Sequence, residues 1–356
     1  MKDTPHSQIT GHLILAACAV LSALLLISCN RGGNRYYTID GTTQGTTFHI
    51  VFQPAVVGDS SFTAVRDSIN ACLERIDFSV SGYNKASVLT AFNEEGREQV
   101  DGIFYGNFLA SKKMYEVSDG LFDASAAPLF DLWGFGFKTG TDVTEPMIDS
   151  VLAFVGMEHF RAEVLKGSGG ADSIVIFRDD PRCKLNFNAI AQGYTSDYLG
   201  AKLEEMGVLN YLVEVGGEVY AKGVNPSGAK WNVGIDRPTD GNNSPGAYVQ
   251  AVVRITDQGL VTSGDYRKFY IKDGRKISHS INPKTGHPVE HNLLSATVVA
   301  DNATVADGYA TYLMVLGFDK AREAVMATDG IEALLIYSIA DSLAVWMSDG
   351  LEASAN

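Results

Sequence analysis

Helix-type and strand-type hydrophobic patterns are interleaved along this chain in no regular order, and this limits its fold more than any other feature. Apolar residues recur at helical spacing near residues 61–77, 104–117, 145–155, 193–206 and 304–316, which predicts a helix in each range. Runs rich in β-branched and aromatic residues predict strands at Thr46–Phe52, Ser173–Phe177, Tyr211–Val215, Trp231–Ile235, Tyr248–Ile255, Ser295–Val299 and Glu332–Tyr337. Because no regular strand–helix–strand rhythm is present, we expect an α+β fold with a mixed β-sheet and flanking helices.

Residues 39–356 are expected to form one interwoven catalytic domain. From Tyr36 onward the chain has no low-complexity segment, no long linker and no repeat of roughly 20–50 residues. Its 46% hydrophobic and 20% charged residues are typical of a globular protein. With 28 Lys and Arg against 42 Asp and Glu, the net charge is −14, and no basic run is present. Nucleic acid is therefore not an expected partner.

The first 28 residues are expected to be a signal peptide. Leu13–Ile27 is apolar, but its 15 residues fall short of the roughly 20 that a spanning helix needs, so it is better explained as the apolar part of such a peptide. Leu26-Ile27-Ser28-Cys29 resembles the lipobox of bacterial lipoproteins. The resemblance implies that Cys29 is lipidated, that residues 29–38 are a tether, and that the protein is anchored to a bacterial membrane facing the periplasm. A plain secretory signal with an incidental cysteine is the alternative.

Two cysteines, Cys72 and Cys183, follow Cys29. Cys72 falls on the apolar face of the helix predicted at 61–77, which favours a buried free thiol over a disulfide. Neither spacing suggests a zinc site.

Clusters of small, polar and turn-forming residues interrupt the predicted helices and strands, and chemistry is expected there. Three lie in the first half of the chain: Gln44-Gly45-Thr46, then Ser81, Tyr83, Ser87 and Asn93, then Gly120, Phe122, Asp123, Pro128, Leu129 and Trp133. Each also has a plain structural explanation. The first is a strand entrance, the second a turn after a helix, and the third a set of aromatic residues that fill a core.

Two further clusters combine glycines with predicted regular structure. In residues 186–194 we expect a strand to pass through a glycine turn into a helix, whose free N–H groups are suited to a phosphate. In residues 214–218 a buried strand ends in Gly216 and Gly217, which lets a ligand approach the backbone closely. A turn with no ligand needs the same residues in both cases.

The last two clusters are the most informative chemically. His279 lies among hydroxyl groups, after Ser263-Gly264-Asp265 and before Pro283, and its ordinary pKa near neutrality suits a general base. A structural histidine is the alternative. Asp307 and Thr311 are four residues apart, so they share a helix face. Their oxygens are hard ligands suited to Mg²⁺, and a plain polar stripe is the alternative.

In this order, over roughly residues 40–340, the clusters resemble the ApbE family, the Mg²⁺-dependent FAD:protein FMN transferases. The resemblance implies that the carbonyl of Ala189, the carboxylate of Asp307 and the hydroxyl of Thr311 bind Mg²⁺, with His279 as the base. It implies that FAD is contacted by Gln44, Tyr83, Asp123, Gln192, Gly216, Gly217, Glu218, Ser263 and Gly264. Gln44 stands where the family has methionine. Gln192 stands where it has lysine, whose charge a neutral amide cannot supply.

The resemblance also implies the reaction. FMN passes from FAD to a Thr or Ser hydroxyl of a target protein and AMP leaves, with Mg²⁺ balancing the phosphate charge. The targets implied are subunits of the Na⁺-translocating NADH:quinone reductase or of Rnf-type complexes. Three alternatives remain: an FAD pyrophosphatase that yields FMN and AMP, a non-catalytic flavin-binding lipoprotein, and a substrate-binding protein of a transporter.

Overall fold

The computed structural model describes residues 35–136, 142–167, 172–238, 248–265, 269–272, 275–340 and 342–355. The predicted signal peptide (1–28) and Cys29 lie outside the described residues. The first strand, β1, spans Tyr37–Thr43 because it pairs with the next strand along its whole length. Strand β1 therefore begins two residues before the predicted domain boundary at residue 39, and the tether predicted at residues 29–38 stays a prediction.

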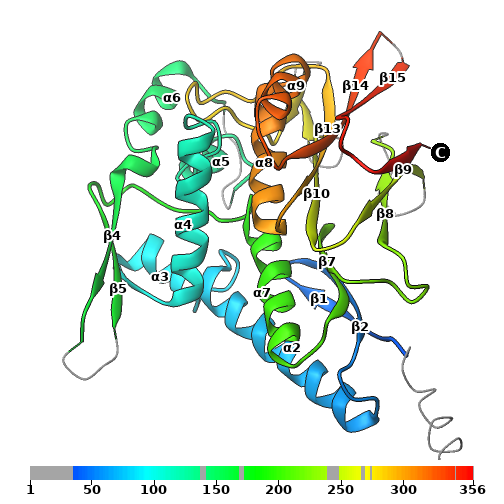
Figure 1. Ribbon diagram of the computed structural model, residues 1–356. Coiled ribbons are helices and arrows are strands. Elements are labelled where there is room, and N and C mark those ends of the chain that lie inside the picture. The colour runs from blue at the N-terminus through cyan, green and yellow to red at the C-terminus, as the bar shows by residue number, and fades with distance from the viewer. Residues whose placement is uncertain are drawn as a thin grey trace, which may run out of the picture.

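An eight-stranded sheet forms the centre of the molecule (Figure 1). From edge to edge its strands are β1, β2 (Thr46–Gln53), β6 (Asn210–Val215), β7 (Glu218–Lys222), β10 (Gln258–Gly264), β13 (Leu293–Ala300), β14 (Glu332–Ile339) and β15 (Ser342–Met347). The predicted α+β class is confirmed. Every pairing among the described strands of this sheet is antiparallel rather than mixed. Tight turns account for three of these pairings, since they join β1 to β2, β6 to β7 and β14 to β15.

Smaller sheets lie around the central one. The first contains β16 (Ala353–Ala355), β9 (Val249–Ile255) and β8 (Trp231–Asp236), the second β3 (Gln99–Val100), β5 (Ser173–Arg178) and β4 (Phe160–Leu165), and the third β11 (Phe269–Lys272) and β12 (Arg275–Ser278). All seven predicted strands coincide with observed ones. Nine described strands were not predicted: β1, β3, β4, β7, β10, β11, β12, β15 and β16. Five of them, β3, β7, β11, β12 and β16, have only two to five residues and carry too little alternation to be recognised.

Helices cover the sheet and fill the space beside it. They are α2 (Asp59–Val80), α3 (Val88–Glu95), α4 (Gly102–Val117), α5 (Ala127–Leu132), α6 (Glu145–Leu152), the 3₁₀ helix η1 (Met157–His159), α7 (Ala191–Glu205), α8 (Ala303–Leu316) and α9 (Phe318–Met326). The five predicted helices correspond to α2, α4, α6, α7 and α8. Across the described part of the chain, no helix combines the length and apolar character needed to cross a membrane.

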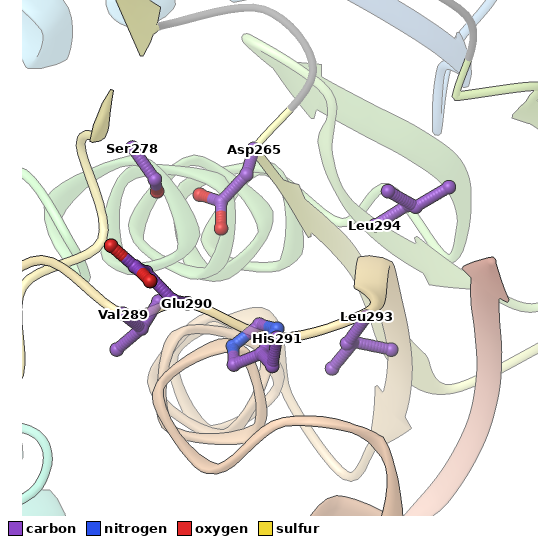
Figure 2. Close-up of a pocket in the computed structure, with 7 residues that line it drawn as sticks. All are labelled: Asp265, Ser278, Val289, Glu290, His291, Leu293 and Leu294. Atoms are coloured by element: carbon purple, nitrogen blue, oxygen red, sulfur yellow. The ribbon is translucent and has the colours of Figure 1, made fainter. Parts of the chain in front are cut away.

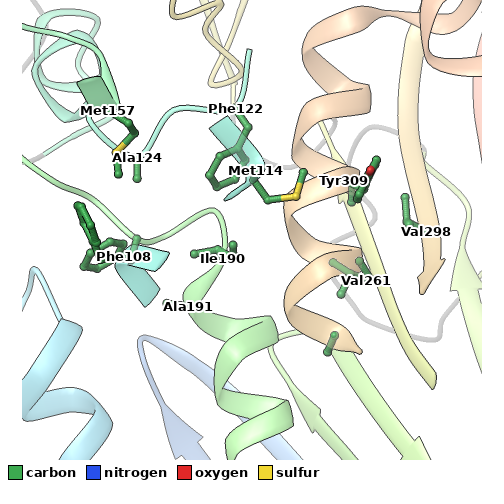
Figure 3. Close-up of a cluster of buried hydrophobic side chains, with 14 of the residues drawn as sticks. Phe108, Met114, Phe122, Ala124, Met157, Ile190, Ala191, Val261, Val298 and Tyr309 are labelled. Carbon is green, nitrogen blue, oxygen red and sulfur yellow. The ribbon is translucent and has the colours of Figure 1, made fainter. Parts of the chain in front are cut away.

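Helix α8 lies at the centre of the largest hydrophobic core (Figure 3). Met114 and Phe122 pack on one side of it, and Val261 of β10 and Val298 of β13 lie on the other. The first turns of α8 carry small buried residues, and at Gly259 an added Cβ would stand 2.2 Å from the Ala303 nitrogen. Because α8 is held this closely, it is a rigid support for polar residues on it.

The antiparallel register gives the sheet two distinct ends, which we call the site end and the entry end. The turns after β1 and β6 and the last residues of β10 lie at the site end. The beginning of β1, the end of β2, the beginning of β6 and the end of β7 lie at the entry end. The clusters that the sequence singled out in β1–β2, β6–β7 and β10 therefore all lie at the site end.

Candidate functional site

A cavity of about 330 Å³ opens at the site end of the sheet. Its walls come from the segments around α5, the beginning of α7, the end of β10, the turn after β12 and helix α8. Ten of the predicted site residues line it: Tyr83, Asp123, Ala189, Gln192, Glu218, Ser263, Gly264, His279, Asp307 and Thr311. Segments separated by more than 200 residues in the sequence thus supply a single site.

Three predicted residues lie beside the cavity rather than in its wall. Gln44 lines an adjoining cavity of about 110 Å³, which shares Tyr83 and Gln192 with the first. Gly216 lies behind Gln192, where an added Cβ would stand 2.4 Å from the Gln192 Nε2, and its φ of 70° also favours glycine. Gly217 completes the same turn and donates its N–H to Glu214 Oε1 at 2.6 Å. The two glycines shape the turn that supports Gln192.

Asp307 is the most deeply buried ionisable group of the cavity. It is 5% exposed, and its Oδ2 accepts a hydrogen bond from the Gly193 N–H at 3.1 Å. Burial, together with the nearby charge of Asp197, raises the pKa of the Asp307 carboxyl well above its usual range. Among the ion pairs of the described residues, none joins Asp307 to a basic side chain. Such a carboxylate is stabilised best by a cation.

Helices α7 and α8 meet so closely because of two sequence features. Gly193 lies in the first turn of α7. The prediction for residues 186–194 was wrong on this point, because it placed the glycine in a turn between a strand and the helix, and no strand directly precedes α7. An added Cβ at Gly193 would stand 2.4 Å from the Ala303 oxygen, so only glycine fits. Asp197 accepts hydrogen bonds from the backbone N–H groups of Ala303 and Thr304, both at 2.8 Å. These bonds fix the start of α8 and hence the position of Asp307.

The oxygen donors expected for Mg²⁺ lie around one part of the cavity. Asp307 and Thr311 are one turn apart on α8, and Ala189 precedes α7 on the facing wall. Within the described ranges, no group of three or more His, Cys, Asp or Glu is arranged to hold a metal ion. One buried carboxylate with a hydroxyl and a carbonyl is instead a donor set suited to Mg²⁺, which keeps several of its waters. These residues fit the implied ion.

His279 also lines the cavity, with its side chain 35% exposed. Its Nδ1 is 3.5 Å from Oδ1 of Asp265, which also accepts a hydrogen bond from the Ser280 hydroxyl at 2.6 Å. The edge of the Phe135 ring faces the imidazole, with 6.4 Å between the ring centroids. A carboxylate beside Nδ1 favours a proton on that nitrogen, which leaves Nε2 as the acceptor. The arrangement suits a general base.

A second cavity of about 340 Å³ is lined by Asp265, whose Oδ1 accepts from Ser280 in the wall of the first (Figure 2). In the view of Figure 2 the carboxylates of Asp265 and Glu290 lie above His291, and Leu293 lies beside it. The His291 Nε2 donates to the Met314 carbonyl at 2.6 Å, since a carbonyl can only accept. None of the residues predicted to bind FAD or Mg²⁺ or to act as the base lines this cavity. We therefore place the chemistry in the first cavity.

The first cavity combines acidic groups with a large apolar wall. Asp123, Glu218 and Asp307 line it, and none of the described residues in its lining is Lys or Arg. Burial raises the pKa of Asp123 to about 6, although hydrogen bonds from Ser125 oppose that shift. Phe130 and Phe135 belong to the apolar wall, and Tyr83 stands 69% exposed at its edge. Aromatic residues of this kind suit a flat ring system.

Several lining residues were not given a role from the sequence. Asn186 and Asn188 belong to the cluster predicted at residues 186–194, and they line the cavity on either side of buried Phe187. Ile281 and Met314 also line it. Their apolar character is typical of core residues, so nothing in the sequence distinguishes them as parts of a site.

Comparison with known proteins points to one family. The family model described as the ApbE family matches residues 44–335. The chain is 33% identical to the FAD:protein FMN transferase of Salmonella typhimurium, over 93% of this chain and 95% of that relative. It is 34% identical to the FAD:protein FMN transferase of Escherichia coli K12, over 87% of this chain and 86% of that relative.

Solved structures of ApbE proteins have a similar fold. The flavin transferase ApbE from Vibrio cholerae aligns with a TM-score of 0.73 at 29% identity, over 88% of this chain and 97% of that one. The apo form of the Pseudomonas stutzeri flavinyl transferase ApbE aligns with a TM-score of 0.76 at 28% identity, over 88% and 95%. The range that the family model matches contains every residue that lines the first cavity.

Proposed function

The chain belongs to the ApbE family and is an FAD:protein FMN transferase, and we propose that it uses Mg²⁺ to move FMN from FAD onto a Thr or Ser hydroxyl of a target protein. AMP is the leaving group. The observation that carries the proposal is the charge of the cavity. Among the described residues that line it are three carboxyl groups and no Lys or Arg, so a pyrophosphate bound there needs a cation from solution.

Ala189, Asp307 and Thr311 would hold that cation. When bound, Mg²⁺ supplies positive charge next to the phosphate oxygens. The chain's own contribution is to fix Asp307 through the Gly193 N–H and to exclude water with the apolar wall. Gln192 stands in place of the lysine expected from the family and carries no charge, so the metal would have to balance the phosphate charge.

His279 would act as the base. The target hydroxyl oxygen forms a bond to the phosphorus on the flavin side of FAD, and the bond from that phosphorus to the bridging oxygen breaks. AMP leaves with that oxygen, and the hydroxyl proton passes to His279 Nε2. General-base help of this kind is worth on the order of 10²–10⁴-fold in rate. Asp265 keeps the imidazole in the tautomer that can accept the proton.

We further propose where the enzyme acts. Lipidation at Cys29 would anchor it to a bacterial membrane on the periplasmic side. Its targets would then be exposed domains of membrane complexes, in the class of the Na⁺-translocating NADH:quinone reductase and Rnf-type subunits. This part of the proposal comes from the lipobox resemblance and the family resemblance in the sequence.

The test is to incubate the protein with FAD, Mg²⁺ and a periplasmic domain of such a subunit, and to measure FMN attachment by intact mass. We expect the wild type and His49→Ala, a control in a histidine–aspartate pair outside the cavity, to attach FMN. His279→Ala should bind FAD but lose most of the transfer. Release of FMN and AMP with no attachment would make the protein an FAD pyrophosphatase. FAD that stays intact would make it a flavin binder.

A further inference from the structure

Four aliphatic side chains are exposed together at the entry end of the sheet. They are Val56 (71% exposed), Val57 (44%), Leu209 (67%) and Val224 (40%), and we call them the entry-end patch. Single exposed aliphatic residues are common on protein surfaces, whereas a contiguous group marks a contact surface.

Backbone and side-chain contacts make the patch continuous. Val56 and Val57 follow β2, whose last residue Gln53 pairs with Asn210 at the start of β6. Leu209 immediately precedes Asn210, and the Asn210 Oδ1 accepts a hydrogen bond from the Val224 N–H at 2.8 Å. An added Cβ at Gly207 would stand 3.3 Å from the Ala55 Cβ, so the loops on either side of β2 and β6 touch.

The first described residues, Arg35 and Tyr36, lie next to the patch. The Tyr36 hydroxyl donates to the Val224 carbonyl at 2.7 Å, and β1 begins at the next residue. Cys29 is six residues before Arg35, a length of at most about 20 Å when extended. The apolar segment Leu13–Ile27 precedes Cys29. If the chain is held at a membrane through this segment or through Cys29, the entry end is the part of the domain nearest to the lipid.

Two of the carboxylates near the patch are paired with lysines. Glu204 is 2.6 Å from the ammonium of Lys222, and Glu205 is 2.9 Å from that of Lys202. Because the whole chain carries a net charge of −14, anionic lipids offer it no electrostatic attraction. A contact through aliphatic side chains with a neutral lipid surface is consistent with both facts.

We propose that the entry-end patch rests on the surface of a lipid bilayer and sets the orientation of the domain on it. The register of the sheet then places the flavin cavity at the far end of the strands. The eight residues of β2 span roughly 27 Å at about 3.4 Å each. The domain therefore presents its cavity away from the membrane, and it takes acceptor hydroxyls that stand at about that height above the lipid.

Site-directed spin labelling of the full-length protein on phosphatidylcholine vesicles tests this proposal. Single cysteines are introduced as Val56→Cys and Leu209→Cys, with Leu109→Cys as the matched control. Leu109 is a 45% exposed leucine on α4, on the other side of the molecule in Figure 1. Cys72 and Cys183 are buried, and the labelled parent protein serves as the blank for any native cysteine that reacts.

The readout is spin relaxation by oxygen, which concentrates in lipid, and by a water-soluble nickel chelate. On vesicles, labels at 56 and 209 should gain several-fold in relaxation by oxygen and lose relaxation by nickel, whereas the label at 109 should not change. Equal responses at all three positions would overturn the proposal, even for a protein that is anchored by its lipid. A protein that does not sediment with the vesicles would overturn it as well.

Discussion

Gly193→Ala should weaken both the fold and the metal site, because the position has no room for a side chain. The new methyl group would stand 2.4 Å from the Ala303 oxygen and 2.8 Å from the Asp307 Cβ, so α7 and α8 have to separate. Overpacking of this kind costs about 1–3 kcal/mol. The separation also lengthens the hydrogen bond from the Gly193 N–H to Asp307, and a bond to a charged group contributes about 1.5–3 kcal/mol.

The assay is urea unfolding, together with FAD binding as a function of Mg²⁺ concentration. We expect Gly193→Ala to lose at least about 2 kcal/mol of unfolding free energy and to need more Mg²⁺. The matched control is Gly102→Ala, at the first residue of α4, where an added Cβ meets nothing within 4 Å. That variant should be neutral or up to about 1 kcal/mol more stable. Equal stability and equal Mg²⁺ dependence of the two variants would refute the close contact between α7 and α8.

Three other predictions concern groups with separate roles. The folded protein holds the Asp123 proton up to a pKa of about 6, whereas the unfolded chain releases it near pH 4. The unfolding free energy of the wild type relative to Asp123→Asn should therefore fall as the pH rises from about 4 to 6. A difference between the two unfolding free energies that stays the same over this pH range in urea unfolding would contradict this. Tyr83→Ala should weaken FAD binding by about 0.5–1.5 kcal/mol and leave the urea midpoint unchanged, because the ring is 69% exposed. Cys29→Ala should move the protein from the membrane to the soluble or unprocessed fraction, and an unchanged fractionation would argue against lipidation.

The sequence was most informative where local spacing alone decides geometry. Asp307 and Thr311 lie on α8 as their four-residue spacing predicted, because the apolar pattern of residues 304–316 left little doubt about a helix. The predicted buried free thiol is also observed, since Cys72 faces the core from α2. The α+β class could be predicted because long strands and helices keep their own periodicity.

What the sequence could not predict depends on contacts between distant segments. Nothing local shows that Asp265 faces His279, or that Asp197 holds the first turn of α8. The first turn of α7 was mistaken for a turn before the helix, because a glycine usually interrupts helices. Here the absence of a side chain at Gly193 leaves room for the close approach of α8. Phe130 and Met314 look like core residues until the fold places them along the cavity.

The most direct test of the account is the affinity for FAD, measured by quenching of its fluorescence, with Mg²⁺ and with a chelator. The described lining of the cavity has three carboxyl groups and no Lys or Arg, so the wild type should bind FAD more tightly with Mg²⁺, on the order of tenfold or about 1.4 kcal/mol. Asp307→Asn should lose that difference while it remains folded. A wild type that binds FAD equally tightly in the chelator, or an Asp307→Asn variant that keeps the full Mg²⁺ effect, would contradict the account.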